Sequence, residues 1–379
     1  MAALVELDSL EILVVVDNEY GIPSYVTRKC TTNSSLGSLD PISPCPNPAV
    51  QQSGSLKDLG INGSSITTND RGDAKKELRM DSICCSAHGL SLLITGVVGN
   101  KRHTMLFDTG PENRIFELNA QRLRAPLGDI EAIHLSHWHR DHSGGMLKVL
   151  EMAGAAGAKS ISVDLHPDRP DYRGIMAMAP ISMEADPTFE EIEKAGGRVE
   201  KHGEAHGVLE NCFMVSGEIP RVTKYELGLK RGIRFAKETG KWEEDTLIKD
   251  ERYLMCKLKG AQSPPTPAPS TVPPVFDQLT LATDKGLVLF TGCSHAGVVN
   301  ASRNAVDLGS GTPLYAVMGG YHLADAEPEL ISDSVADLKA LEPKVLLAGH
   351  CTGWRAKFEI ERQMPGRLVP SFVGSKFVL

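Results

Sequence analysis

The sequence lacks the features that mark several common classes of protein. Its longest apolar runs fall well short of the roughly 20 residues that cross a bilayer. Basic residues are also outnumbered, with 40 Lys and Arg against 48 Asp and Glu, which leaves a net charge of −8. Such a balance gives no general attraction to phosphate backbones or anionic lipids. We therefore expect neither a nucleic-acid partner nor a membrane partner.

Paired cysteines and a targeting segment are also missing. The eight cysteines show no CxxC spacing, which argues against a disulfide scaffold and against a cysteine-rich zinc ribbon. The first residues, "MAALVELDSLE", do not combine a basic stretch with an apolar one, so we expect no secretory or mitochondrial targeting signal. We expect reduced thiols and a cytoplasmic location.

Two stretches carry little periodic apolar sequence. Residues 28–82 are rich in Ser, Asn, Gly and Pro, and residues 261–275 read "AQSPPTPAPSTVPPV". Such composition is typical of surface loops that contribute little to a core. We interpret residues 1–379 as one domain with a surface insertion at 28–82 and a Pro-rich loop at 261–275.

Short apolar runs alternate with helical patterns along the rest of the chain. The later half reads strand, helix, strand, helix, strand from "GLVLFTG" to "KVLLAG". An earlier strand, "IEAIHLS", follows a predicted helix, "NRIFELNAQRL". Alternation of this kind is typical of helices packed on the faces of a sheet. The sequence therefore predicts an α/β fold.

Histidines gather at three of the predicted strand ends. "HWHRDH" follows "AIHLS", "CSH" follows "LVLFTG", and "HC" follows "VLLAG". Because polar groups beyond strand ends share one edge of such a sheet, we expect their side chains to converge. Imidazole and carboxylate groups in such a cluster are suitable metal ligands. The predicted ligands are His137, His139, Asp141, His142, His295 and His350.

The spacing favours two ions over one. His137 and His139 point the same way in an extended segment, whereas Asp141 and His142 follow a turn and can face a second ion. Paired divalent ions would activate water for hydrolysis of an ester, phosphoester or amide. We expect zinc, with iron or manganese as alternatives.

The same residues carry a resemblance to a known family. "HWHRDH" and "LFDTGP" resemble the HxHxDH signature and the preceding aspartate element of the metallo-β-lactamase superfamily. "TGCSHAGVVN", "MGGYHL" and "GHCTGW" are similar to its branch of 7,8-dihydropterin-6-methyl-4-(β-D-ribofuranosyl)-aminobenzene-5′-phosphate synthases. The resemblance implies a four-layer αββα sandwich. It also implies His137 and His139 on one metal, Asp141 and His142 on the other, His350 as a late ligand, and Asp108 as a residue that orients the loop.

One departure from the family pattern leaves the ligand set open. Many members carry a bridging aspartate where this chain has Cys293, with His295 two residues later. We favour His295 as the additional ligand, because a turn after a buried strand aims it at the same edge. Cys293 as a thiolate ligand and His322 as a ligand or substrate contact remain alternatives.

The substrate is less clearly encoded. Arg221 and Lys224 follow a predicted strand and can hold a phosphate or carboxylate, and Glu218 can carry a proton. Glu218 and Arg221 can equally form a loop salt bridge. With Asp141 they form the predicted catalytic set.

Three functions fit this sequence. The first is a metal-dependent enzyme that activates water to act on a small anionic substrate. The second is a dihydropterin phosphate synthase-type transferase. The third is an iron-containing redox or oxygen-binding protein, because the same ligand set holds iron well.

Overall fold

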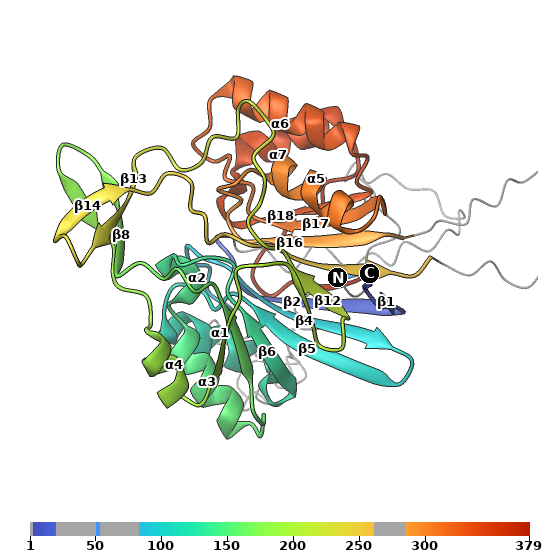
Figure 1. Ribbon diagram of the computed structural model, residues 1–379. Helices are drawn as coiled ribbons and strands as arrows, with labels where there is room; N and C mark the ends of the chain where they lie inside the picture. The colour runs from blue at the N-terminus through green and yellow to red at the C-terminus, as the bar shows by residue number, and fades with distance from the viewer. Residues whose placement is uncertain (1–2, 20–50, 54–82, 261–284) are drawn as a thin grey trace, which may run out of the picture.

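The computed structural model describes residues 3–19, 51–53, 83–260 and 285–379. Over these residues, two large sheets pack face to face (Figure 1). The first sheet has the strand order β10-β7-β6-β5-β4-β2-β19-β3. Its strands are β2 (Ser9–Val16), β3 (Gln51–Ser53), β4 (Ser91–Val98), β5 (Lys101–Phe107), β6 (Ile130–His134), β7 (Ser162–Leu165), β10 (Arg198–Lys201) and β19 (Lys376–Val378).

The second sheet has the order β11-β12-β15-β16-β17-β18, with β1 also paired to β15. Its strands are β1 (Glu6–Leu7), β11 (His206–Val208), β12 (Phe213–Val215), β15 (Leu254–Leu258), β16 (Leu287–Thr291), β17 (Leu314–Gly319) and β18 (Val345–Ala348). Parallel pairing of β16, β17 and β18 brings their carboxyl ends to one edge. The pairing of β5, β6 and β7 does the same in the first sheet.

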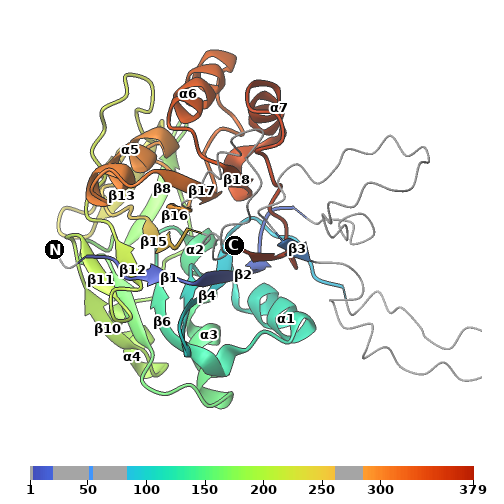
Figure 2. The same cartoon turned by 90° about the vertical axis from the view of Figure 1, so that its right-hand side faces the viewer.

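Helices cover the outer face of each sheet (Figure 2). Those over the first sheet are α1 (Asn113–Leu123), α3 (Met146–Ala155) and α4 (Phe189–Lys194), and those over the second are α5 (Val298–Leu308), α6 (Pro328–Ala340) and α7 (Trp354–Gln363). Short helices lie at the strand ends, namely η3 (Leu127–Asp129), α2 (Arg140–Ser143) and η4 (His350–Thr352). The predicted four-layer αββα arrangement is therefore confirmed.

The main core lies between the sheets because alternate residues of their strands face inward. Phe107 of β5 and Phe290 of β16 meet there, with 6.3 Å between ring centroids, and both are fully buried. Separate apolar clusters lie under the two helical layers. Two sheets each buried on both faces explain the near-continuous apolar strands seen in the sequence.

A four-stranded sheet lies outside the sandwich, and the sequence patterns predict no element of it. It has the order β14-β13-β8-β9 and comprises β8 (Tyr172–Met176), β9 (Pro180–Ser182), β13 (Gly232–Ala236) and β14 (Lys241–Glu244). It projects from one side of the molecule in Figure 1. Its buried Arg173 donates to the Trp138 carbonyl at 2.8 Å, so this sheet supports the histidine-rich loop.

The predicted insertion lies mostly outside the described residues. Within 28–82, Gln51–Ser53 forms β3 and pairs with β19 at the edge of the first sheet. The Pro-rich stretch 261–275 lies wholly outside the described residues. Among the helices that the structure describes, none combines the length and apolar character that a membrane crossing requires.

Truncation of a core ring tests the packing between the sheets. Phe290→Ala should lower the free energy of unfolding by about 3–5 kcal/mol, because it removes a fully buried ring and leaves a cavity. The matched control is Phe358→Ala on α7, whose side chain is 68% exposed and whose loss should cost little. Urea denaturation followed by circular dichroism measures both. Equal effects of the two substitutions would contradict the assigned core.

Candidate metal centre

Three strand ends bring seven potential ligands together. His137 and His139 lie in the loop after β6, and α2 carries Asp141 and His142. Cys293 and His295 follow β16, and His350 opens η4 after β18. These residues form two groups, whose ligand atoms lie within 4.8 Å of one another in each group: His137, His139 and His295; and Asp141, His142, Cys293 and His350.

The first group consists of three imidazoles. Nδ1 of His139 lies 2.9 Å from Nε2 of His137 and 3.1 Å from Nε2 of His295. Burial holds the pKa of each ring well below its usual value, and the neighbouring imidazoles act in the same direction. All three rings are therefore neutral near pH 7, with lone pairs available to a cation.

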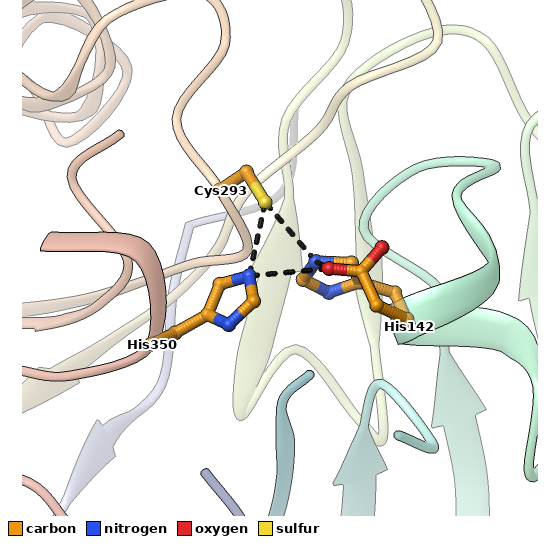
Figure 3. Close-up of side chains that lie close together, drawn as sticks. His142, Cys293 and His350 are labelled. Atoms are coloured by element: carbon orange, nitrogen blue, oxygen red, sulfur yellow. Dashed lines mark hydrogen bonds and ion pairs between the residues drawn. The ribbon is translucent and has the colours of Figure 1, made fainter. Parts of the chain in front are cut away.

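The second group mixes nitrogen, oxygen and sulfur. Sγ of Cys293 lies 3.2 Å from Nε2 of His142 and 3.1 Å from Nε2 of His350, as Figure 3 shows. Oδ2 of Asp141 lies 3.4 Å from the same two nitrogens. Two imidazoles, a carboxylate and a thiol thus face one point, which is a suitable donor set for zinc.

In three of the rings, the hydrogen bond made by Nδ1 determines the tautomer and leaves the lone pair on Nε2. The hydroxyl of Ser136 donates to Asp108, so it accepts from Nδ1 of His137 at 2.9 Å. Nδ1 of His142 donates to Asp108 at 2.6 Å, and Nδ1 of His350 donates to Oδ1 of Asn18 at 2.9 Å. In the neutral form of each ring, Nε2 is then unprotonated and faces its group. Metal-binding histidines are normally oriented in this way.

The charges around His142 also fit a cation. Burial alone would lower the pKa of His142, but the carboxylates of Asp141 and Asp108 raise it well above its usual value. Positive charge is therefore favoured at this ring, and a divalent ion can replace the proton. Burial raises the pKa of the Cys293 thiol well above its usual value, so a thiolate there requires a cation nearby. The residues present fit two divalent ions.

Buried carboxylates hold the ligand-bearing loops in place. Oδ2 of Asp250 accepts from the backbone N–H of Trp138 at 2.7 Å. Glu251 accepts from the backbone N–H groups of His295 at 2.8 Å and Ala296 at 2.6 Å. Neither carboxylate can be recognised from the sequence, because nothing in its local pattern links it to loops so far away in the chain.

Close backbone approach explains a glycine in the second loop. A Cβ at Gly292 would overlap the hydroxyl of Ser136. That hydroxyl links Asp108 to His137. Glycine at 292 therefore allows the loop after β16 to lie against the loop after β6, and the two ligand loops meet.

Other predicted site residues lie around these groups. The His322 ring is 4.5 Å from that of His295 between centroids, so it borders the first group. Arg221 is half-buried and donates to the Leu247 carbonyl, and Glu218 is exposed. Within the described residues, no ion pair or hydrogen bond joins Glu218 to Arg221 or joins either residue to the two ligand groups.

His88 is a further residue at the site, and no sequence pattern points to it. Its Nε2 lies 3.3 Å from Oδ2 of Asp141, and its side chain is 69% exposed. Asn18, which follows β2, contacts Nδ1 of His88 at 3.0 Å. The strand-end criterion that found the ligands would also have found Asn18, because it follows the buried run "LEILVVV". His88 lies before β4 and does not follow a buried strand, so the strand-end criterion does not find it.

Comparisons with known proteins find related sequences. The family model described as "Metallo-beta-lactamase superfamily" matches residues 90–223. A protein of Methanocaldococcus jannaschii named 7,8-dihydropterin-6-methyl-4-(β-D-ribofuranosyl)-aminobenzene-5′-phosphate synthase is 28% identical over 304 residues, covering 75% of this chain and 90% of the relative. An uncharacterised protein of the same organism is 26% identical over 269 residues, covering 71% and 85%.

One solved structure shows the same fold. It is described as a metal-dependent hydrolase of the β-lactamase superfamily, and it superposes with a TM-score of 0.59 at 19% sequence identity. The superposition covers 97% of this chain and 98% of that chain.

Substitutions in each group should show whether each group binds its own ion. His139→Gln should remove one ion by breaking the three-imidazole group, and Cys293→Ser should remove or weaken the other. Cys293→Asp should keep it, because a carboxylate oxygen also suits zinc and manganese. Elemental analysis after dialysis measures the ions, and circular dichroism checks the fold. The control is His103→Gln, at a histidine that faces Glu131. Unchanged metal content in both His139→Gln and Cys293→Ser would contradict two separate ion sites.

Proposed function

We propose that this chain is a dinuclear metal-dependent enzyme of the metallo-β-lactamase superfamily, whose model matches residues 90–223. It activates water to act on a small anionic substrate that carries a phosphate or a carboxylate. The observation that carries the proposal is the pair of donor groups at one edge of the sandwich. Divalent ions held by these two groups would activate water as a nucleophile at neutral pH and polarise an oxygen of the substrate.

The donor types favour zinc. Cys293 supplies sulfur to the second group, and His137, His139 and His295 supply nitrogen to the first. Zinc accepts both kinds of donor in tetrahedral sites, whereas manganese prefers oxygen. Iron(II) also accepts histidine and carboxylate ligands, and it remains the alternative ion.

Asp141 is assigned to proton transfer as well as to metal binding. Its side chain is 20% exposed, whereas the adjacent His142 is fully buried. His88 reaches its Oδ2 at 3.3 Å from a largely exposed position. Because Nδ1 of His88 accepts from the amide of Asn18, its Nε2 carries the proton and donates to Asp141. The pair can therefore pass a proton between the ligand groups and solvent.

Arg221 is assigned to the anionic part of the substrate. It lies in the loop after β12, and its guanidinium donates to the Leu247 carbonyl. Its Nε is shielded from solvent and has no hydrogen-bond partner among the described residues. A guanidinium with an unused donor is suited to a phosphate or a carboxylate. Glu218, which is exposed, is the second candidate for a proton carrier.

A synthase-type transfer is the second candidate function. The archaeal synthase aligns over 90% of its own length, so the resemblance is not confined to the ligand motif. The reaction would use the same ligand groups and the same anionic subsite. Its product would be a dihydropterin joined to a ribofuranosyl-aminobenzene phosphate, as the name of that relative indicates.

Metal analysis and a substrate panel test the proposal together. Protein purified without added metal should contain up to two equivalents of zinc, and chelation should abolish turnover of a phosphodiester, a lactone or a dihydropterin phosphate. His139→Gln and Asp141→Asn should lose activity by at least about 100-fold, on the scale of losing a principal catalytic group. Turnover of the pterin alone would favour the synthase. If the protein instead contains iron with a redox-active absorption band and turns over none of these substrates, the redox function would replace both the hydrolase and the synthase.

Arg221→Gln tests the anionic subsite. It should raise KM by roughly 10-fold or more while kcat stays nearly constant, because a charge-assisted hydrogen bond is worth about 1.5–3 kcal/mol. The matched control is Arg303→Gln, whose guanidinium pairs with Asp337 on the surface. Steady-state kinetics on the turned-over substrate measure both variants. An unchanged KM in Arg221→Gln would place the anionic subsite elsewhere.

A further inference from the structure

A third cluster of histidines lies apart from the two ligand groups. It surrounds Asp164 of β7, which is 4% exposed. His202 follows β10, His206 begins β11, and the ligand atoms of these three residues lie within 4.8 Å of one another. His134, the last residue of β6, approaches the same carboxylate from the core side. None of the four belongs to the two ligand groups of the metal centre.

The carboxylate of Asp164 has one oxygen in a conventional ion pair and one facing imidazoles. Oδ1 accepts from the buried Arg252 at 2.8 Å. Oδ2 lies 2.9 Å from Nε2 of His206 and 3.4 Å from Nδ1 of His134. Arg252 therefore fixes the orientation of the carboxylate and leaves Oδ2 to the histidines.

The tautomer of His206 exposes a lone pair to that oxygen. Its Nδ1 donates to the Glu204 carbonyl at 2.9 Å, so a neutral His206 has no proton on Nε2. An unprotonated nitrogen and a carboxylate oxygen 2.9 Å apart repel each other unless a cation lies between or beside them. Donation from the outer nitrogen to a backbone carbonyl is also how metal-binding histidines are oriented.

Three further ring nitrogens in the cluster make no hydrogen bond. His134 is fully buried, and neither of its nitrogens makes a hydrogen bond among the described residues. Nδ1 of His202, also shielded from solvent, is likewise without a hydrogen bond and lies 3.6 Å from Oδ1 of Asp164. The rings of His202 and His206 lie 4.0 Å apart between centroids. Unpaired buried polar atoms are costly, so a shared partner is expected.

We propose that Asp164, His202 and His206 form a third metal site, separate from the ligand groups of the metal centre, that takes a zinc-like divalent ion. Two imidazoles and one carboxylate are a suitable ligand set for such an ion. The His202 side chain is 39% exposed and that of His206 is 20% exposed, so the ion and its water ligands can enter from solvent. His134 closes the inner side.

The position of the cluster suggests a structural role. Asp164 belongs to the first sheet and His206 to the second. An ion held by both would join the two sheets at the strand ends near the metal centre. His134 also lies only three residues before His137, so the third site would steady the base of the ligand loop without contacting a substrate.

Metal counting on the full-length protein tests the third site. Protein stripped by chelator is titrated with Zn²⁺ and, separately, with Co²⁺, and bound metal is counted after gel filtration. Wild-type protein should hold one more equivalent than His206→Gln and one more than His202→Gln. In both variants, the visible absorption of the Co²⁺ form should fall in proportion to the bound metal that is lost. His103→Gln is the matched control and should keep the wild-type count.

The comparison is independent of the proposed function. His139→Gln should lose an ion together with activity, whereas His206→Gln should lose an ion and keep turnover. If the metal centre held fewer ions than proposed, the one-equivalent difference between wild type and His206→Gln would remain. The conservative substitutions avoid Asp164, whose loss would leave Arg252 buried without its partner.

The competing explanation is a proton instead of a metal ion. The ion pair with Asp164 raises the pKa of His206 against the opposing effect of burial, so a doubly protonated ring could satisfy Oδ2. Equal metal counts in wild type, His202→Gln and His206→Gln would overturn the proposal and leave a protonated ion pair in its place. A one-equivalent loss in both variants, with an unchanged circular dichroism spectrum, would support it.

Discussion

The carboxylate of Asp108 is the interaction on which the geometry of the metal centre depends. It lies at the end of β5, fully buried, and accepts from the backbone N–H of Ser136 at 2.7 Å, from its hydroxyl at 2.8 Å, and from Nδ1 of His142 at 2.6 Å. One side chain thus orients a ligand in each group, because the Ser136 hydroxyl in turn holds His137. Asp108 itself has a left-handed φ of 58°, a strained conformation that surrounding hydrogen bonds maintain.

The fold and most of the candidate ligands could be predicted because they depend on local patterns. Short apolar runs mark buried strands, and residues just beyond parallel strands share an edge. The choice between Cys293 and His295 could not be settled in this way. The structure places His295 with the first group and Cys293 with the second. Between them, Ser294 has a left-handed φ of 63°, and that turn lets neighbouring ligands diverge. Nothing in the residue types predicts it.

Support for the ligand loops could not be predicted, because it comes from distant carboxylates. Asp250 binds the backbone of Trp138 across 112 positions, and Glu251 binds that of His295 across 44. Both lie in an irregular stretch between β14 and β15, where apolar periodicity is absent. Their role depends on the four-stranded sheet that brings Arg173 to Asp250, within hydrogen-bond distance. Only tertiary contacts, which single-sequence patterns do not encode, specify this arrangement.

The pairing of β19 with β2, which are far apart in the sequence, has a consequence for folding during synthesis. β1 pairs with β15 in the second sheet, and β19 pairs with β2 in the first. Residues 376–378 must therefore leave the ribosome before the first sheet can gain the strand that separates β2 from β3. Domains are generally acquired from the amino end as synthesis proceeds. Here, the amino-terminal sheet stays open at that edge, exposing the backbone of β2, until residues 376–378 have been synthesised.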